Sequence, residues 1–171
     1  MMPEMDGIET CEKIRAHSEF SETIVVFLTA RNEDYSQVAG FEAGADDYIP
    51  KPIKPKVLIS KVKALLRRIK NPVSNSKDTL KVGKLIIDNE AYKVINKGEE
   101  IFLPRKEFEL LSLLTSKPGK VFKREDILFQ VWGNEVVVGG RTIDVHIRKL
   151  REKIGEKSFK TVKGVGYKYV V

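Results

Sequence analysis

Basic side chains recur through the segment from Arg141 to Gly155, RTIDVHIRKLREKIG, at a spacing that fits an α-helix. At about 3.6 residues per turn, the apolar residues fall on one stripe, formed by Ile143, Ile147, Leu150 and Ile154. The opposite side carries Arg141, Val145, Arg148 and Lys149. Guanidinium and ammonium groups bind phosphates and base edges, and a valine methyl can contact the thymine methyl. The pattern predicts a helix for the DNA major groove, although a solvated surface helix would show the same basic side.

The residues that follow this segment predict a β-hairpin. Two short β-prone runs, 158–162 and 167–171, flank the sequence Lys163-Gly164-Val165-Gly166. The two glycines permit the positive φ values that a tight turn requires, and Lys163 would project from the tip. A major-groove helix beside a hairpin with a basic tip is the arrangement of a winged helix. The hairpin therefore favours DNA as the partner over the solvated-surface interpretation.

Composition limits the class of protein. The chain has 171 residues, of which 32% are charged and 42% hydrophobic, as in a globular protein of one or two domains. No apolar run approaches the ~20 residues of a transmembrane helix, and the first residues lack the apolar core of a signal peptide. The single Cys11 excludes an internal disulfide and is expected in a helix core. These features predict a cytoplasmic protein without a membrane partner.

The net charge of +7 is concentrated near the C-terminal end. Residues 141–171 hold 9 Lys and Arg against 3 Asp and Glu, whereas residues 1–77 hold 12 against 11. The positive excess therefore lies on the predicted helix and hairpin, where a phosphate-binding surface requires it.

The first half of the chain alternates between helical and strand-like segments. Helical periodicity marks residues 6–17, 31–43 and 55–69. A short apolar run marks residues 23–29, and a second short strand is expected over residues 46–49. A continuous, partly β-branched run is typical of a strand buried on both faces of a parallel sheet. This half is therefore expected to have an α/β fold.

The second half opens with strands and continues with helices. We expect strands over 80–88, 91–95 and 99–103, and helices starting near Phe108 and over 124–132 before the basic helix. Between the halves, residues 71–78 are polar and aperiodic, which predicts a linker. The domains are accordingly expected at residues 1–70 and 79–171.

Several motifs occur together in a fixed order. In the second half they are Glu107-Phe108-x-Leu110-Leu111, Pro118-Gly119-x-Val121, Val131-Trp132-Gly133, the segment from Arg141 to Arg151, and Val162-Lys163-Gly164-Val165-Gly166-Tyr167. In the first half they are Met2-Pro3-x-Met5-Asp6-Gly7, Thr29-Ala30, Gly44-Ala45-Asp46-Asp47-Tyr48 and Lys51-Pro52. Over essentially the whole chain, this set resembles OmpR/PhoB-type response regulators, the transcription factors of bacterial two-component systems. The resemblance implies part of a receiver domain followed by an α+β winged helix-turn-helix domain.

The resemblance implies double-stranded DNA as the main partner. The residues matching the family's DNA contacts are Arg141, Thr142, Val145, His146, Arg148, Lys149 and Arg151 on the helix, and Thr161 and Lys163 on the hairpin. Lys163 is expected to reach the minor groove, and Asp144 to orient Arg148 as an i,i+4 pair. The loop 133–140 lies where family members contact RNA polymerase. A sensor histidine kinase is the further partner of an intact regulator.

The resemblance also implies a flavodoxin-like receiver of which only the last two strands are expected here. Thr29 and Lys51 match the hydroxyl and ammonium that bind the phosphoryl group, and Tyr48 matches the switch aromatic. The phosphoacceptor aspartate of the family stands just before the Met-Pro motif, and the Mg²⁺ ligands stand on an earlier strand. Because the chain has no matching residues, we expect no catalytic residue, no metal site and no cofactor.

Family receivers form homodimers through a face lined with ion pairs. At one of these pairs the matching positions hold Gln37 and Val57, which cannot form it. The cross-subunit pairs expected to remain are Asp47 with Lys61 and Glu42 with Lys63. The resemblance thus implies a homodimer with fewer ion pairs than usual.

Three classes of function are compatible with these motifs to different degrees. The leading interpretation is a sequence-specific DNA-binding transcriptional regulator of a two-component system, without a phosphoacceptor in this chain. The alternative is a truncated interaction module that dimerises with an intact response regulator and modulates it. An enzyme is disfavoured, because receivers need the missing carboxylates to catalyse phosphoryl transfer.

Overall fold

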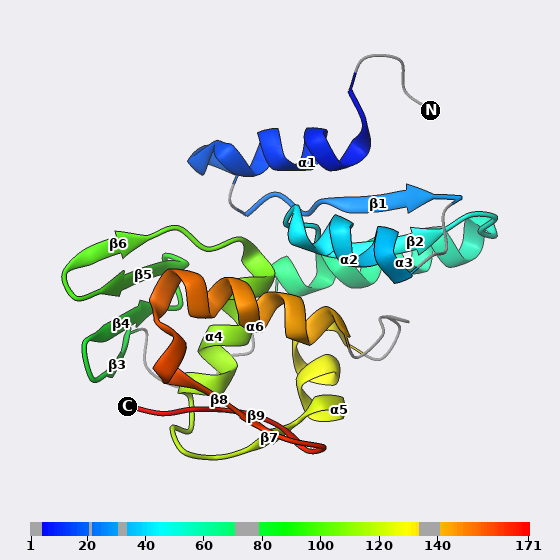
Figure 1. Ribbon diagram of the computed structural model, residues 1–171. Helices are drawn as coiled ribbons and strands as arrows, with labels where there is room; N and C mark the ends of the chain where they lie inside the picture. Colours follow the sequence, from blue (N-terminus) through cyan, green and yellow to red (C-terminus); the bar gives the residue numbers. More distant parts are fainter. Residues whose placement is uncertain (1–4, 21, 31–33, 71–78, 134–140) are drawn as a thin grey trace.

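The computed structural model describes residues 5–20, 22–30, 34–70, 79–133 and 141–171. The predicted linker, 71–78, and most of the predicted polymerase-contacting loop, 134–140, lie outside these residues. Figure 1 shows the first half of the chain lying against the second, with the helix α2 (Asp34–Glu42) next to the basic helix α6 (Arg141–Ile154).

The first half alternates helices and strands, as the sequence predicts. In chain order its elements are α1 (Gly7–Ala16), η1 (Ser18–Phe20), β1 (Val26–Thr29), α2, β2 (Asp47–Pro50) and α3 (Pro55–Lys70). Helix α1 is capped by Asp6, whose carboxylate accepts a hydrogen bond from the Glu9 amide at 2.9 Å. Strand β1 starts three residues later than the apolar run that predicts it.

The strands β1 and β2 pair in parallel, with Val26 opposite Asp47 and Thr29 opposite Pro50. Helix α2 connects them, as a parallel pair requires. Tyr48 lies between Phe27 and Phe41, with ring centroids 6.1 and 6.5 Å away. These aromatic contacts form the small core of the first half, together with buried Cys11.

The second half begins with an antiparallel meander. Its strands are β3 (Thr79–Val82), β4 (Leu85–Asp88), β5 (Lys93–Asn96) and β6 (Glu99–Ile101), paired in that order. The single strand expected over 80–88 is therefore wrong, because the chain reverses at Gly83, whose φ is +61°. Glycine adopts this left-handed conformation at little cost.

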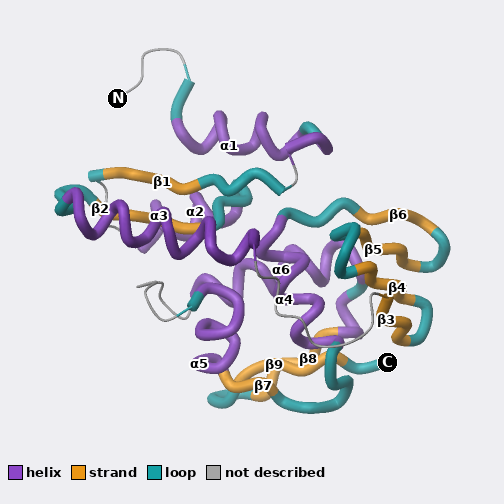
Figure 2. Tube along the Cα trace, turned by 180° about the vertical axis from the view of Figure 1, so that it is seen from behind, coloured by secondary structure: helices purple, strands orange, loops and turns teal. Residues whose placement is uncertain are grey.

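Helices and a hairpin follow the meander. The helices are α4 (Arg105–Thr115), α5 (Arg124–Ile127) with its π-helical continuation η2 (Leu128–Trp132), α6, and the short turn η3 (Glu156–Ser158). A second antiparallel sheet has the order β7 (Phe122–Lys123), β9 (Gly166–Tyr169), β8 (Phe159–Val162). Figure 2 shows this sheet at the far end of the helices from the first half. The basic helix and the hairpin are thus confirmed close to their predicted bounds.

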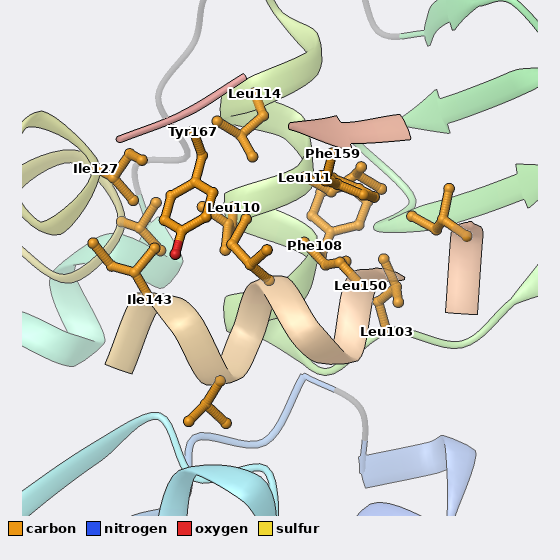
Figure 3. Packing of buried hydrophobic residues seen from close by; sticks show 14 of the residues in the cluster. Leu103, Phe108, Leu110, Leu111, Leu114, Ile127, Ile143, Leu150, Phe159 and Tyr167 are labelled. Atoms are coloured by element: carbon orange, nitrogen blue, oxygen red, sulfur yellow. The ribbon is translucent and has the colours of Figure 1, made fainter. Parts of the chain in front are cut away.

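The core of the second half lies between α4, α6 and the hairpin sheet. Figure 3 shows Ile143 and Leu150 of α6 pointing toward Leu110 and Leu111 of α4, with Tyr167 beside them. The side chains of Ile143, Leu150, Leu110 and Leu111 are fully buried. Burying a leucine or isoleucine stabilises a fold by about 1.5–3 kcal/mol. The apolar stripe read from the sequence is therefore what fixes the orientation of α6.

The two glycines of the hairpin have different roles and allow a matched test. A Cβ on Gly166 would lie 1.9 Å from the Phe122 carbonyl oxygen, whereas a Cβ on Gly164 would meet only open space. We expect Gly166→Ala to break the β7–β9 pairing and unfold the winged domain. Gly164, at φ +73°, should tolerate alanine at a cost of about 1–2 kcal/mol. Denaturant unfolding of both variants checks this, and equal stabilities would contradict it.

Candidate nucleic-acid interface

The hairpin is tied to α6 by side-chain hydrogen bonds. Arg151 donates from Nη2 to the Phe159 carbonyl and to Thr161 Oγ1, both at 2.9 Å. Thr161 and Arg151 were both expected to contact DNA, and the structure brings them together at the outer strand of the hairpin. Lys163 is exposed at the hairpin tip, as expected.

A second tie joins the first turn of α6 to the hairpin. The Asp144 carboxylate accepts hydrogen bonds from Arg124 Nη2 and from the Tyr167 hydroxyl, both at 2.5 Å. Arg124 also lies over the Tyr167 ring, 5.2 Å from its centroid. Burial and the Asp144 carboxylate raise the pKa of Tyr167 to about 12, so its hydroxyl stays a donor at neutral pH. The expected pairing of Asp144 with Arg148 is therefore wrong.

The side of α6 opposite its apolar stripe is covered in part, contrary to expectation. Thr142, Val145 and His146 are only 3%, 7% and 3% exposed, although all three were predicted to face DNA. One cause is that α2 of the first half packs against α6. The His146 ring lies between Trp132, at 5.1 Å, and Phe41 of α2, at 6.0 Å between centroids.

The cations of α6 have different environments. Arg141 and Arg148 are exposed, and Lys149 is half-buried. Arg148 Nη2 lies 2.7 Å from Glu42 Oε1 at the end of α2, and Arg148 Nε lies 3.5 Å from Glu152 on its own helix. The structure thus places one of the predicted DNA contacts on a carboxylate of the first half.

The ion pairs expected across a homodimer face are arranged differently within the chain. Lys61 Nζ lies 3.5 Å from Asp47 Oδ2, so this pair forms internally between α3 and β2. Burial is the main cause that raises the pKa of Asp47, and Lys61 opposes it. Glu42 contacts Arg148 instead of Lys63, and Lys63 is exposed. The pairs expected between two subunits stay a prediction.

The residues that match the receiver's phosphoryl-binding groups lie at the carboxyl ends of the two strands. Thr29 ends β1, and its carbonyl accepts a hydrogen bond from the Lys51 amide at 2.6 Å. Tyr48 is buried between Phe27 and Phe41, and the Lys51 residue is exposed. The described residues thus bring Thr29 and Lys51 together at one edge, as the resemblance implies.

A buried ionic cluster at the start of α4 was not predicted from the sequence. Lys106 Nζ lies 2.6 Å from both Glu109 Oε2 and the Val131 carbonyl oxygen, and Arg105 Nε lies 2.8 Å from Glu109 Oε1. On the same helix Glu107 pairs with Lys153 of α6 at 2.7 Å, and burial raises the pKa of Glu107. The cluster connects α4 to both η2 and α6. The sequence shows only three consecutive charged residues there, which also suit a solvated helix start.

In the part of the chain that the structure describes, no group of three or more His, Cys, Asp or Glu side chains could hold a metal ion. Likewise, none of its helices is long and apolar enough to cross a membrane.

The helices α4, α5 and α6 with the hairpin β8–β9 define a winged-helix domain, preceded by a unit with parallel strands. Two family models match the chain: "Transcriptional regulatory protein, C terminal" over residues 98–169 and "Response regulator receiver domain" over residues 1–63. The Transcriptional regulatory protein SrrA of Staphylococcus aureus is 42% identical over 182 residues, covering 100% of this chain and 74% of SrrA. The chain belongs to the OmpR/PhoB-type response regulators of two-component systems.

Two solved structures extend the comparison. Response regulator DrrB of Thermotoga maritima, an OmpR/PhoB homologue, is 37% identical with a TM-score of 0.51, over 100% of this chain and 76% of DrrB. The DNA-binding domain of Klebsiella pneumoniae RstA, solved in complex with the RstA box, is 28% identical with a TM-score of 0.50, over 55% of this chain and 98% of that domain. The receiver match begins at residue 1, so it does not support the expectation that the receiver lacks its N-terminal half.

The environment of His146 predicts how stability depends on pH. Burial lowers the pKa of His146 from 6.5 to about 4, and Lys106 and Lys153 act in the same direction. Between these pH values the unfolded chain binds a proton that the folded chain does not. The contribution of His146 to the free energy of unfolding is therefore complete above about pH 6.5. On acidification below this pH, the free energy of unfolding falls by on the order of 1 kcal/mol per pH unit.

The measurement is denaturant unfolding at several pH values in wild type, His146→Gln and His17→Gln. His17 is exposed and serves as the control. We expect His146→Gln to flatten the pH dependence and His17→Gln to leave it unchanged. Equal slopes of the unfolding free energy against pH in the two variants would contradict the assignment of this pH dependence to His146.

Proposed function

We propose that this chain is a sequence-specific transcriptional regulator that binds double-stranded DNA through α6 and the β8–β9 hairpin. The observation that carries the proposal is that the hydrogen bonds of Asp144 and Arg151 hold the hairpin against α6. They make the basic helix and Lys163 parts of one rigid surface. A rigid surface loses little conformational entropy on binding.

The roles of individual residues follow from their chemistry. Arg141, Arg148 and Lys149 supply cations for phosphates and guanine edges. Lys163 at the hairpin tip supplies a cation for the minor groove. Arg151 and Thr161 complete the surface. Thr142, Val145 and His146, which are buried in this structure, are proposed as further DNA contacts of the same helix. The DNA complex of the RstA domain supports DNA as the partner of this fold.

Further partners are proposed on the family alone. A sensor histidine kinase is the expected input, and the segment 133–140 is proposed to contact RNA polymerase. The receiver is proposed to form a homodimer through the face that holds Glu42, Asp47, Lys61 and Lys63. Cytoplasmic location fits a partner that is chromosomal DNA.

We propose that residues 1–171 contain no phosphoacceptor and no Mg²⁺ site, and that the chain is not an enzyme. Thr29 and Lys51 remain as phosphoryl-binding groups without a matching acceptor. Residues 1–70 are accordingly proposed to be the part of a receiver that carries its last two strands. Phosphoryl transfer to a carboxylate needs an acceptor and acidic metal ligands together.

A second candidate function, an interaction module that modulates an intact regulator, is supported by an exposed apolar surface. Leu28 on β1 is 42% exposed, and α3 exposes further apolar side chains. They are Val57, Ile59, Val62 and Leu66. Exposed apolar groups at an unpaired strand edge favour a protein partner.

Binding should depend on two cations in different ways. Arg148→Ala should weaken specific binding by about 1–3 kcal/mol if the guanidinium binds a guanine edge. Lys163→Ala should weaken binding to all sequences and lower the slope of log affinity against log salt by about 1. Binding isotherms on a selected duplex and on a random one measure both effects. Lys13→Ala, on α1, is the control; equal affinities in all variants would contradict the proposed surface.

Phosphoryl transfer should not occur on this chain. Incubation with acetyl phosphate and Mg²⁺ is expected to add no mass by intact mass spectrometry. An intact response regulator serves as the positive control. A stoichiometric acid-labile phosphate, mapped for example to Asp6, would overturn the proposal.

A further inference from the structure

The outer face of the hairpin sheet, on the side away from the core, carries three lysines. The residues of this sheet that face the core are aromatic and buried: Phe122, Phe159, Tyr167 and Tyr169. Because side chains alternate between the two faces of a strand, the intervening lysines point outward. They are Lys123 on β7, Lys160 on β8 and Lys168 on β9, and together they are called the lysine face. Figures 1 and 2 show no described helix or strand beyond this sheet.

The two segments that build the sheet contain no acidic residue. Residues 117–123 hold three lysines and residues 157–171 hold four, with no Asp or Glu in either segment. Their combined charge of +7 equals the net charge of the whole chain. The lysines that form ion pairs among the described residues all lie elsewhere: Lys13, Lys61, Lys93, Lys106 and Lys153. The charge of the lysine face is therefore not balanced within the described part of the molecule.

Two of these lysines are placed where they repel each other. Lys160 and Lys168 lie directly opposite in adjacent strands, and like charges in this position destabilise a sheet. Lysine on an edge strand can prevent unwanted pairing with other sheets, which is a sufficient reason for Lys160 on β8. Strand β9, however, is the central strand of the three, so edge protection does not explain Lys168. An anionic partner for this face does explain it.

We propose that the lysine face binds phosphates of the DNA that flanks the site contacted by α6 and Lys163. The inference rests on the proposed DNA-binding function and extends it to a second surface. Lys163 stands at the tip of the hairpin, where its inner and outer faces meet. A duplex that lies across the tip therefore meets the outer face when it curves toward the sheet. Bending DNA costs free energy, which the additional phosphate contacts offset.

The type of cation indicates the kind of contact. The cations of both sheet segments are all lysines, whereas α6 presents Arg141 and Arg148. A guanidinium forms paired hydrogen bonds of fixed geometry, but an ammonium is a point charge on a flexible stem. The lysine face is accordingly suited to phosphates of any sequence. The helix α6 would select the site, and the lysine face would add affinity that is independent of the flanking sequence.

Replacing the cross-strand pair tests this inference. Lys160→Gln/Lys168→Gln removes two charges from the lysine face and leaves α6, Lys163 and the buried aromatic side chains unchanged. The matched control is Lys81→Gln/Lys84→Gln on the β3–β4 meander, where both lysines are exposed. The two double variants have the same net charge, which removes the general effect of charge on DNA affinity.

The first measurement is the affinity of the full chain for two labelled duplexes at several salt concentrations. One is selected from a random library with wild type and trimmed to the bases that selection fixes, and the other extends it by about 10 base pairs on each side, one helical turn. On the extended duplex, Lys160→Gln/Lys168→Gln should lower the slope of log affinity against log salt by about 2 relative to the control. Wild type should then lose about 10-fold more affinity than this variant between about 50 and 200 mM salt. On the trimmed duplex, the slopes of the two double variants should be equal.

The contrary outcomes are distinct. Equal slopes of the two double variants on the extended duplex would overturn the inference and leave the proposed function standing. Failure of wild type to bind any duplex would refute the proposed function itself. A defect of Lys160→Gln/Lys168→Gln that arises only on duplexes with two copies of the site would assign the lysine face to a second copy of the chain, and would likewise overturn the inference.

The second measurement separates DNA contact from a structural role of the two lysines. In denaturant unfolding without DNA, the midpoint of Lys160→Gln/Lys168→Gln should equal or exceed that of Lys81→Gln/Lys84→Gln, because a repulsion has been removed. A lower midpoint would show that the two lysines stabilise the sheet. Their position would then be explained by folding, and the inference would be overturned.

Discussion

The structure depends on α6 being packed on two sides at once. Its apolar stripe, with Ile143 and Leu150, fills the core of the winged domain, and α2 packs against another side of it. Packing on the first side is permanent, because removing those side chains from the core would expose them to water. Among the described residues, packing on the second side includes a tilted ring contact between Phe41 and His146 and an ion pair between Glu42 and Arg148. The helix is thus shared between the core of the winged domain and the contact with the first half.

The elements of the fold were predictable where the signal is local. The bounds of α6 and the hairpin follow from apolar periodicity and glycine positions, which the residues themselves carry. The reversal at Gly83 was missed because the run 80–88 is continuously β-prone, and a lone glycine in such a run also suits a bulge. A turn there is decided by the pairing of β3 with β4, which the run alone does not specify.

The environment of the candidate site could not be predicted, because it depends on partners distant in the sequence. His146 is buried between Trp132 of its own half and Phe41 of α2, neither of which its position within α6 specifies. Asp144 has Arg148 as its sequence neighbour at i+4, yet it binds Arg124 and Tyr167 from other elements. Charged side chains are long and can reach several partners, so spacing within one helix does not select among them.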